Sequence, residues 1–98
     1  MIFIEETLTF SRWLGALRDP IAKAKIASRI RRLAFGNPGD VVPIGGGLSE
    51  MRIHYGPGYR VYFMQKGSEF VLLLGGGDKS TQDKDIVRAR ALAKEFQP

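Results

Sequence analysis

The chain has 98 residues, 44% of them hydrophobic, which is enough for one domain, residues 1–98, around its own core. It has no cysteine and one histidine, which excludes a disulfide framework, a thiolate metal site and a Cys/His nucleophile pair, so we expect no metal and no cofactor. Its net charge of +5 favours a polyanionic partner, nucleic acid above all. No apolar run reaches the length of a membrane span, and the start "MIFIEETLTF" lacks the basic residues of a signal peptide, so we expect a cytoplasmic protein without membrane contacts.

The first half of the chain predicts a strand and two helices. "IFIE" indicates a strand over Ile2–Glu5. Thr9 or Ser11 is expected to cap a short helix through Arg18, whose buried stripe is Phe10, Trp13, Leu14 and Leu17.

A second helix follows directly. Asp19 as N-cap and Pro20 at the first helical position begin it, and Gly36 ends it. Its apolar stripe is Ile26, Ile30 and Leu33, surrounded by lysines and arginines that form either a solvated face or a partner surface.

After the turn "GNPGD" the apolar pattern changes to a period of two, which predicts consecutive antiparallel strands. These are Val41–Ile44, Leu48–Tyr55, Tyr59–Lys66 and Glu69–Leu74. The last strand, "FVLLL", is apolar on both faces and is expected near the middle of the sheet. A loop "GGGDKS" and a C-terminal helix from Ser80 or Thr81 complete an α+β domain whose helices pack on one sheet face.

The segment "MRIHYGPGYRVYF" predicts a hairpin with Tyr55 opposite Tyr59. In this register His54 pairs with Arg60, and Arg52 pairs with Tyr62. Since side chains alternate across a strand, the core face collects Met51, Ile53, Tyr55, Tyr59, Val61 and Phe63. The other face, which we expect to be open to solvent, collects Arg52, His54, Arg60 and Tyr62.

These four groups suit the metal-free cleavage of RNA. That reaction needs a base for the 2′-OH proton, an acid for the leaving 5′-oxygen, and cations for the charge of the transition state. Histidine suits proton transfer and arginine suits phosphate oxygens. Lys79, after the glycine run, adds a candidate phosphate contact. The alternative is an ordinary solvated face, on which Glu50 partly relieves the repulsion between Arg52 and Arg60.

Three segments, which together span nearly the whole chain, carry a resemblance to a known family. They are "FSRWLGALRDPIAKAKIASRIRRLAFGNPGD", "GGGLSEMRIHYGPGYRVYF" and "LLLGGGDKSTQDKDIVRARALAKEF". In them the chain resembles the addiction-module killer proteins, a HigB-like branch of the RelE/ParE toxin superfamily. The resemblance implies a RelE-like α+β fold, with an N-terminal strand and two helices, then an antiparallel four-strand run and a C-terminal helix. It also implies the toxin of a type II toxin–antitoxin system.

The resemblance implies partners and residue roles as well. The partners are a cognate antitoxin, expected to be a helix-turn-helix DNA-binding protein, and the ribosome with its mRNA, which RelE-like endoribonucleases cut to block translation. The implied catalytic residues are His54, Arg60, Tyr62 and Arg52, and the implied phosphate- or RNA-binding residues are Lys79, Arg52 and Arg60. Relatives often carry a catalytic tyrosine or histidine near the C-terminus, whereas this chain ends "ALAKEFQP", so the acid and the base stay unassigned.

Two other functions remain open on the sequence. One is a non-enzymatic ParE-like poison of DNA gyrase, since fold alone does not fix activity. The other is an inactive remnant that only binds nucleic acid.

Overall fold

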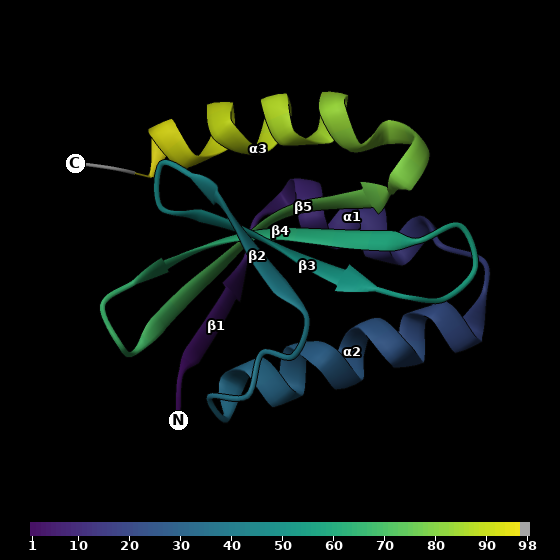
Figure 1. The fold of residues 1–98 in the computed structure, drawn as a ribbon, viewed down its shortest axis with the longest axis horizontal. Coiled ribbons are helices and arrows are strands. Elements are labelled where there is room, and N and C mark those ends of the chain that lie inside the picture. Colours follow the sequence, from purple (N-terminus) through teal and green to yellow (C-terminus); the bar gives the residue numbers. More distant parts are fainter. Residues whose placement is uncertain (97–98) are drawn as a thin grey trace.

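The computed structural model describes residues 1–96 (Figure 1). Within this range the chain forms β1 (Phe3–Glu6), α1 (Leu8–Ala16), α2 (Pro20–Ala34), β2 (Val41–Gly45), β3 (Leu48–Ile53), β4 (Tyr59–Lys66), β5 (Phe70–Asp78) and α3 (Gln82–Glu95). A short 3₁₀ helix, η1 (Lys79–Thr81), joins β5 to α3. The expected α+β class is confirmed. No helix in residues 1–96 is both long enough and apolar enough to cross a bilayer.

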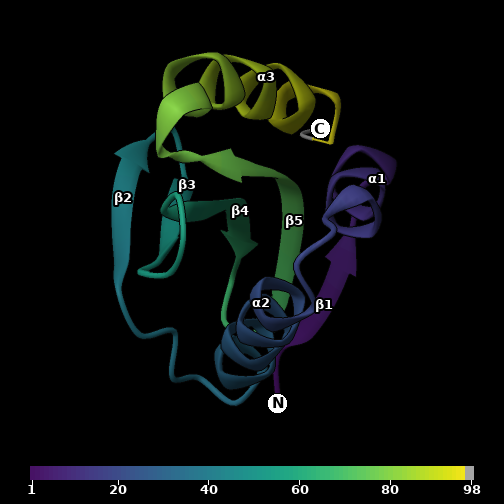
Figure 2. The same ribbon diagram turned by 90° about the vertical axis from the view of Figure 1, so that its right-hand side faces the viewer.

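The strands of this range form one mixed sheet in the order β1-β5-β4-β3-β2. As expected, β2 to β5 pair antiparallel in sequence order. In contrast, β1 lies parallel to β5, and a parallel pair needs a crossover connection. Here the connection contains α1, α2 and the strands β2, β3 and β4. In the sheet, β5 therefore lies between β1 and β4 (Figure 2).

One face of the sheet is covered by α1 and α2. Phe10 of α1 and Ile26 of α2 have no exposed surface. They pack with Leu33 against strand residues of the same cluster, namely Met51, Ile53, Val61, Phe63, Val71 and Leu73. The expected apolar stripes of both helices are therefore confirmed.

The opposite face is covered by α3, so our expectation of helices on one face only is wrong. Ala89 and Ala93 of α3 are buried against Leu48, Tyr62, Met64, Leu72 and Leu74. Figure 1 shows α3 and α2 on opposite sides of the sheet. The physical reason is β5, which is apolar on both faces and needs cover on both.

The second helix begins as predicted, and the first does not. Asp19 caps α2 by accepting a hydrogen bond from the Ile21 amide at 2.9 Å, with Pro20 at the first helical position. The cap of α1 is Thr7 instead of Thr9 or Ser11. Its hydroxyl accepts from the Phe10 amide at 3.1 Å and donates to the Leu74 carbonyl at 2.7 Å. This bond to β5 is long-range, and no local sequence signal indicates it.

The Thr7 hydroxyl is expected to contribute to stability through both bonds. Thr7 is 7% exposed, so Thr7→Ala removes a helix cap and leaves a buried carbonyl without this donor. We expect the free energy of unfolding to fall by about 1–2 kcal/mol in urea denaturation followed by circular dichroism. Thr7→Ser keeps the hydroxyl and should lose much less. Equal losses in the two variants would assign the effect to the methyl group.

The predicted loop "GGGDKS" is wrong for its first four residues. Gly75, Gly76 and Gly77 are part of β5 and pair with Tyr62, Val61 and Arg60 of β4. A bulge at Leu74 precedes them, because the register shifts between Tyr62 and Phe63 of β4. A run of glycines is typical of a turn, but it also permits a strand to pass very close to its neighbours.

Candidate functional site

The hairpin of β3 and β4 presents the expected basic residues in a register shifted by two. Arg52 lies opposite Arg60, and Glu50 lies opposite Tyr62, so the expected pairs are wrong. A shift of two keeps each side chain on its own face, so the expected grouping into two faces is retained.

The shift follows from a longer connection between the strands. β3 ends at Ile53, and His54 lies in the loop. The Tyr55 hydroxyl donates to Asp19 Oδ2 at 2.8 Å, which draws Tyr55 toward the start of α2. This bond lowers the pKa of Asp19 and raises that of Tyr55.

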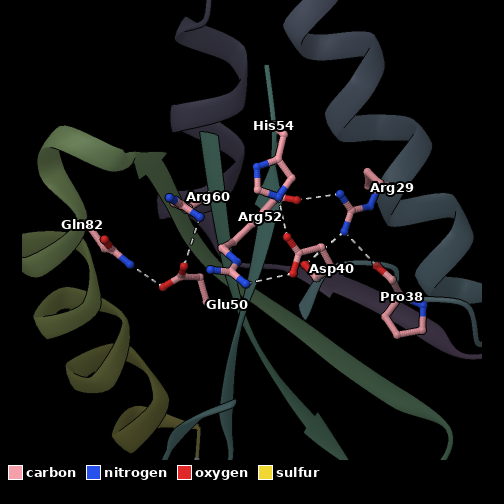
Figure 3. A network of polar contacts seen from close by, with 8 residues as sticks. All are labelled: Arg29, Pro38, Asp40, Glu50, Arg52, His54, Arg60 and Gln82. Carbon is pink, nitrogen blue, oxygen red and sulfur yellow. Dashed lines mark hydrogen bonds and ion pairs between the residues drawn. The ribbon is translucent and has the colours of Figure 1, made fainter. Parts of the chain in front are cut away.

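Asp40, which directly precedes β2, joins two of the expected site residues (Figure 3). Its Oδ1 accepts a hydrogen bond from Arg52 Nη2 at 3.1 Å, and its Oδ2 lies 2.5 Å from His54 Nε2. The side chains of Arg52 and His54 are 37% and 72% exposed. A guanidinium and an imidazole are thus held side by side on one carboxylate, within reach of a ligand.

The charge of Asp40 fixes the tautomer of His54. Hydrogen bonds from His54 and then Arg52 lower the pKa of the Asp40 carboxyl below its usual value. The carboxyl is therefore ionised at neutral pH and only accepts hydrogen bonds. Nε2 of His54 must then carry the shared proton, so in the neutral form of the ring Nδ1 is the nitrogen that can accept a proton. This arrangement suits proton abstraction from a bound substrate.

Arg29 of α2 lies beside this cluster and supports it (Figure 3). Its Nη1 donates to the Arg52 carbonyl at 2.6 Å, and its Nη2 donates to the Pro38 carbonyl at 3.0 Å. Gly39, between Pro38 and Asp40, has a φ of 75°, and a Cβ there would lie 2.9 Å from Arg29 Nη2. The loop that carries Asp40 is therefore fixed by partly buried hydrogen bonds from Arg29. Burial lowers the pKa of Arg29, followed by repulsion from Arg32.

Arg60 is nearly buried and forms an ion pair within the sheet. Its Nη1 lies 3.4 Å from Glu50 Oε1, and the two side chains are 11% and 5% exposed. Gln82 of α3 donates to the other Glu50 oxygen at 2.8 Å. Glu50 thus neutralises Arg60, as the alternative interpretation of the basic face anticipated, and ties β3 and β4 to the start of α3 (Figure 3).

Tyr62 does not lie on an open surface, so that expectation is wrong. It is fully buried beneath α3, and its hydroxyl has no hydrogen-bond partner within residues 1–96. Burial raises the pKa of this hydroxyl, and the Glu50 charge adds to the effect. Tyr62 is therefore not available to stack on a base in this conformation.

Lys79 lies beside the hairpin loop. It is exposed at the start of η1, and its Cβ lies 3.5 Å from where a Cβ on Gly58 would stand. The structure thus brings Arg52 and His54 together, places Lys79 next to their loop, and separates Tyr62 from them. Sequence reasoning missed Asp40 and the role of Arg29. Asp40 could have been found in the sequence as an acid directly before β2, the strand that pairs with the Arg52 strand β3.

Within residues 1–96 no three histidine, cysteine or acidic side chains are grouped so that they could hold a metal ion. In the comparisons with known proteins, no family model matches the chain. A protein of Haemophilus influenzae, described as uncharacterized, is 54% identical over 95 residues, which cover 97% of this chain and 96% of that protein. The chain therefore belongs to the same protein family as this Haemophilus influenzae protein.

Proposed function

We propose that the chain is the toxin of a type II toxin–antitoxin pair and cuts mRNA on the ribosome. The single observation that carries the chemistry is the Asp40 carboxylate, which holds Arg52 and an exposed His54 together. The resemblance of the sequence to RelE-like toxins supports the choice of substrate. The activity would take place in the cytoplasm, where mRNA is translated, and a cognate antitoxin would suppress it.

In the proposed reaction, His54 acts as the base and Arg52 binds the phosphate. Nδ1 of His54 takes the proton from the ribose 2′-OH, whose oxygen then attacks the adjacent phosphorus. The bond to the 5′-oxygen breaks, and this oxygen takes a proton from water. The products are a 2′,3′-cyclic phosphate and a 5′-hydroxyl. Arg52 binds the phosphate oxygens and stabilises their negative charge in the transition state.

A further cation supports binding. Lys79, exposed beside the hairpin loop, contacts a neighbouring backbone phosphate. Arg60 is 11% exposed and neutralised by Glu50, so it stabilises the hairpin and does not contact the RNA. Because mRNA must be oriented for in-line attack, the ribosome supplies positioning that free RNA lacks.

The test is to map the 5′ ends of cellular mRNAs within minutes of inducing the chain from a tightly repressed promoter. New cuts inside translated regions, in frame with the codons, are expected. His54→Ala should reduce them by about a hundredfold, and Arg52→Ala should also reduce them strongly. Arg31→Ala is the matched control, because Arg31 is an exposed arginine on α2 that forms no hydrogen bond or ion pair with Asp40, Arg52 or His54.

Each other result changes the proposal in a defined way. Growth arrest with intact mRNA would replace it with a gyrase poison or another target. Unaffected growth at normal expression would indicate a binding protein or an inactive remnant. Cuts that persist in His54→Ala would place the catalytic group elsewhere.

A further inference from the structure

A groove of about 620 Å³ lies between α1 and α3 along the end of β5. Its floor is formed by Gly75, Gly76 and Gly77, and its walls include Trp13 of α1 and Thr81 of η1. In Figure 2, α1 lies beside β1 and β5, and α3 crosses above the end of β5. The groove is separate from the Arg52–His54 cluster, and none of the residues of that cluster lines it.

The floor of the groove is an unpaired strand edge. β1 pairs with β5 only as far as Glu6 opposite Leu73. The chain then turns into α1, where the Thr7 amide and hydroxyl bond the Leu73 and Leu74 carbonyls. Within residues 1–96, Gly75–Gly77 have backbone partners on β4 alone. An interior strand therefore keeps one free edge, and such edges are templates for another strand.

The charged residues that line the groove are positive in excess. Arg12, Lys84 and Arg88 line it, are exposed, and form no hydrogen bond or ion pair with residues 1–96. Its two acids accept hydrogen bonds from neutral donors, Asp85 from the Thr81 hydroxyl at 2.5 Å and Asp78 from the Ser80 amide at 2.8 Å, so they keep their charges and three cations stand against two acids. A ligand in the groove thus meets unpaired cations on both walls.

We propose that this groove binds an extended acidic peptide segment of a partner protein, which continues the sheet along the edge of β5 that β1 leaves free. The backbone amides and carbonyls of Gly75–Gly77 that point away from β4 pair with the peptide backbone, as in other cases of strand addition. Three residues of strand offer about 10 Å, room for three or four peptide residues. Acidic side chains then reach Arg12 on one wall and Lys84 and Arg88 on the other.

The strand edge favours a peptide over RNA as the occupant. Alternating amide and carbonyl groups pair with another peptide backbone at matching spacing, whereas an RNA backbone presents acceptor phosphates and 2′-OH groups and lacks the repeating N–H and C=O groups of a strand. The proposal rests on the groove alone, so the outcome of the mRNA mapping leaves it unchanged.

The probe is a heptapeptide of alternating glutamate and valine, titrated into the full chain labelled with ¹⁵N. We expect amide shifts centred on Gly75–Gly77 and binding that weakens as salt is added. Arg88→Glu should weaken binding by about tenfold. Arg31→Glu is the matched charge reversal and should weaken it far less. The spectrum of each variant also shows that it is folded.

Two further probes separate strand addition from general charge attraction. The same heptapeptide with proline at its centre lacks a backbone donor and should bind more weakly. An oligouridylate of similar charge should not shift the three glycine amides at matched concentration. The proposal is overturned by unshifted glycine amides, by equal weakening in Arg31→Glu, by unchanged binding of the proline peptide, or by stronger glycine shifts with the oligouridylate.

Discussion

Arg60→Ala is expected to lower the free energy of unfolding by about 3 kcal/mol or more. Arg60 and Glu50 form an ion pair whose side chains are 11% and 5% exposed. Removing the guanidinium leaves Glu50 with the Gln82 amide as its remaining side-chain donor, and an uncompensated buried charge is strongly destabilising. Urea denaturation followed by circular dichroism measures the loss.

A second substitution tests this explanation. In the Arg60→Ala background, Glu50→Gln removes the uncompensated charge and should recover a large part of the lost stability. Arg31→Ala, at an exposed position, should change stability by no more than about 0.5 kcal/mol. Strictly additive effects of the changes at Arg60 and Glu50 would show that the two side chains do not act as a pair.

This expectation bears on how the proposed function is tested. Arg60→Ala would weaken the proposed activity through lost stability, whether or not Arg60 meets RNA. His54 is 72% exposed, and its replacement removes no buried contact. A loss of cleavage in His54→Ala with the fold intact therefore reports on chemistry.

Local signals predicted the elements of the first half well. Asp19 and Pro20 begin α2 because the cap and the fixed φ of proline act within a few residues. The period-two pattern likewise placed the strands that follow. Thr7 was missed because its choice as the cap depends on Leu74, 67 residues away.

The site was predicted in part. Alternation correctly placed Arg52 and Arg60 on one side of the hairpin, since a register shift of two preserves faces. It could not supply Asp40, which reaches the site only through the pairing of β2 with β3. It also missed the burial of Tyr62, because α3 covers that face and one strand's pattern does not show what packs on it.

The glycine run Gly75–Gly77 was also predicted wrongly, because its conformation depends on distant neighbours. We expected a loop at Gly75, Gly76 and Gly77, because glycine is typical of loops. None of the three has a positive φ, so the backbone conformation does not require glycine here. At Gly76 and Gly77, a side chain is excluded by the closeness of Trp13 and Asp85.

Gly76→Ala is accordingly expected to lower the free energy of unfolding by about 2–3 kcal/mol. A Cβ at Gly76 would lie 2.3 Å from the Trp13 ring, so one of the two must move. The ring is held by its packing against Phe10 and Tyr59, with centroids 5.8 and 6.3 Å away. Urea denaturation followed by circular dichroism measures the change.

The neighbouring glycines provide graded controls. A Cβ at Gly75 would make ordinary contact, 3.8 Å from Thr9, so Gly75→Ala should be nearly neutral or slightly stabilising. A Cβ at Gly77 would clash with the Asp85 carboxylate, but that group is the end of a rotatable side chain. Gly77→Ala should therefore lose the Thr81–Asp85 bond and cost less than Gly76→Ala. A larger loss in Gly77→Ala would mean that Asp85 is held more rigidly than Trp13, and equal losses in all three would assign the effect to the backbone.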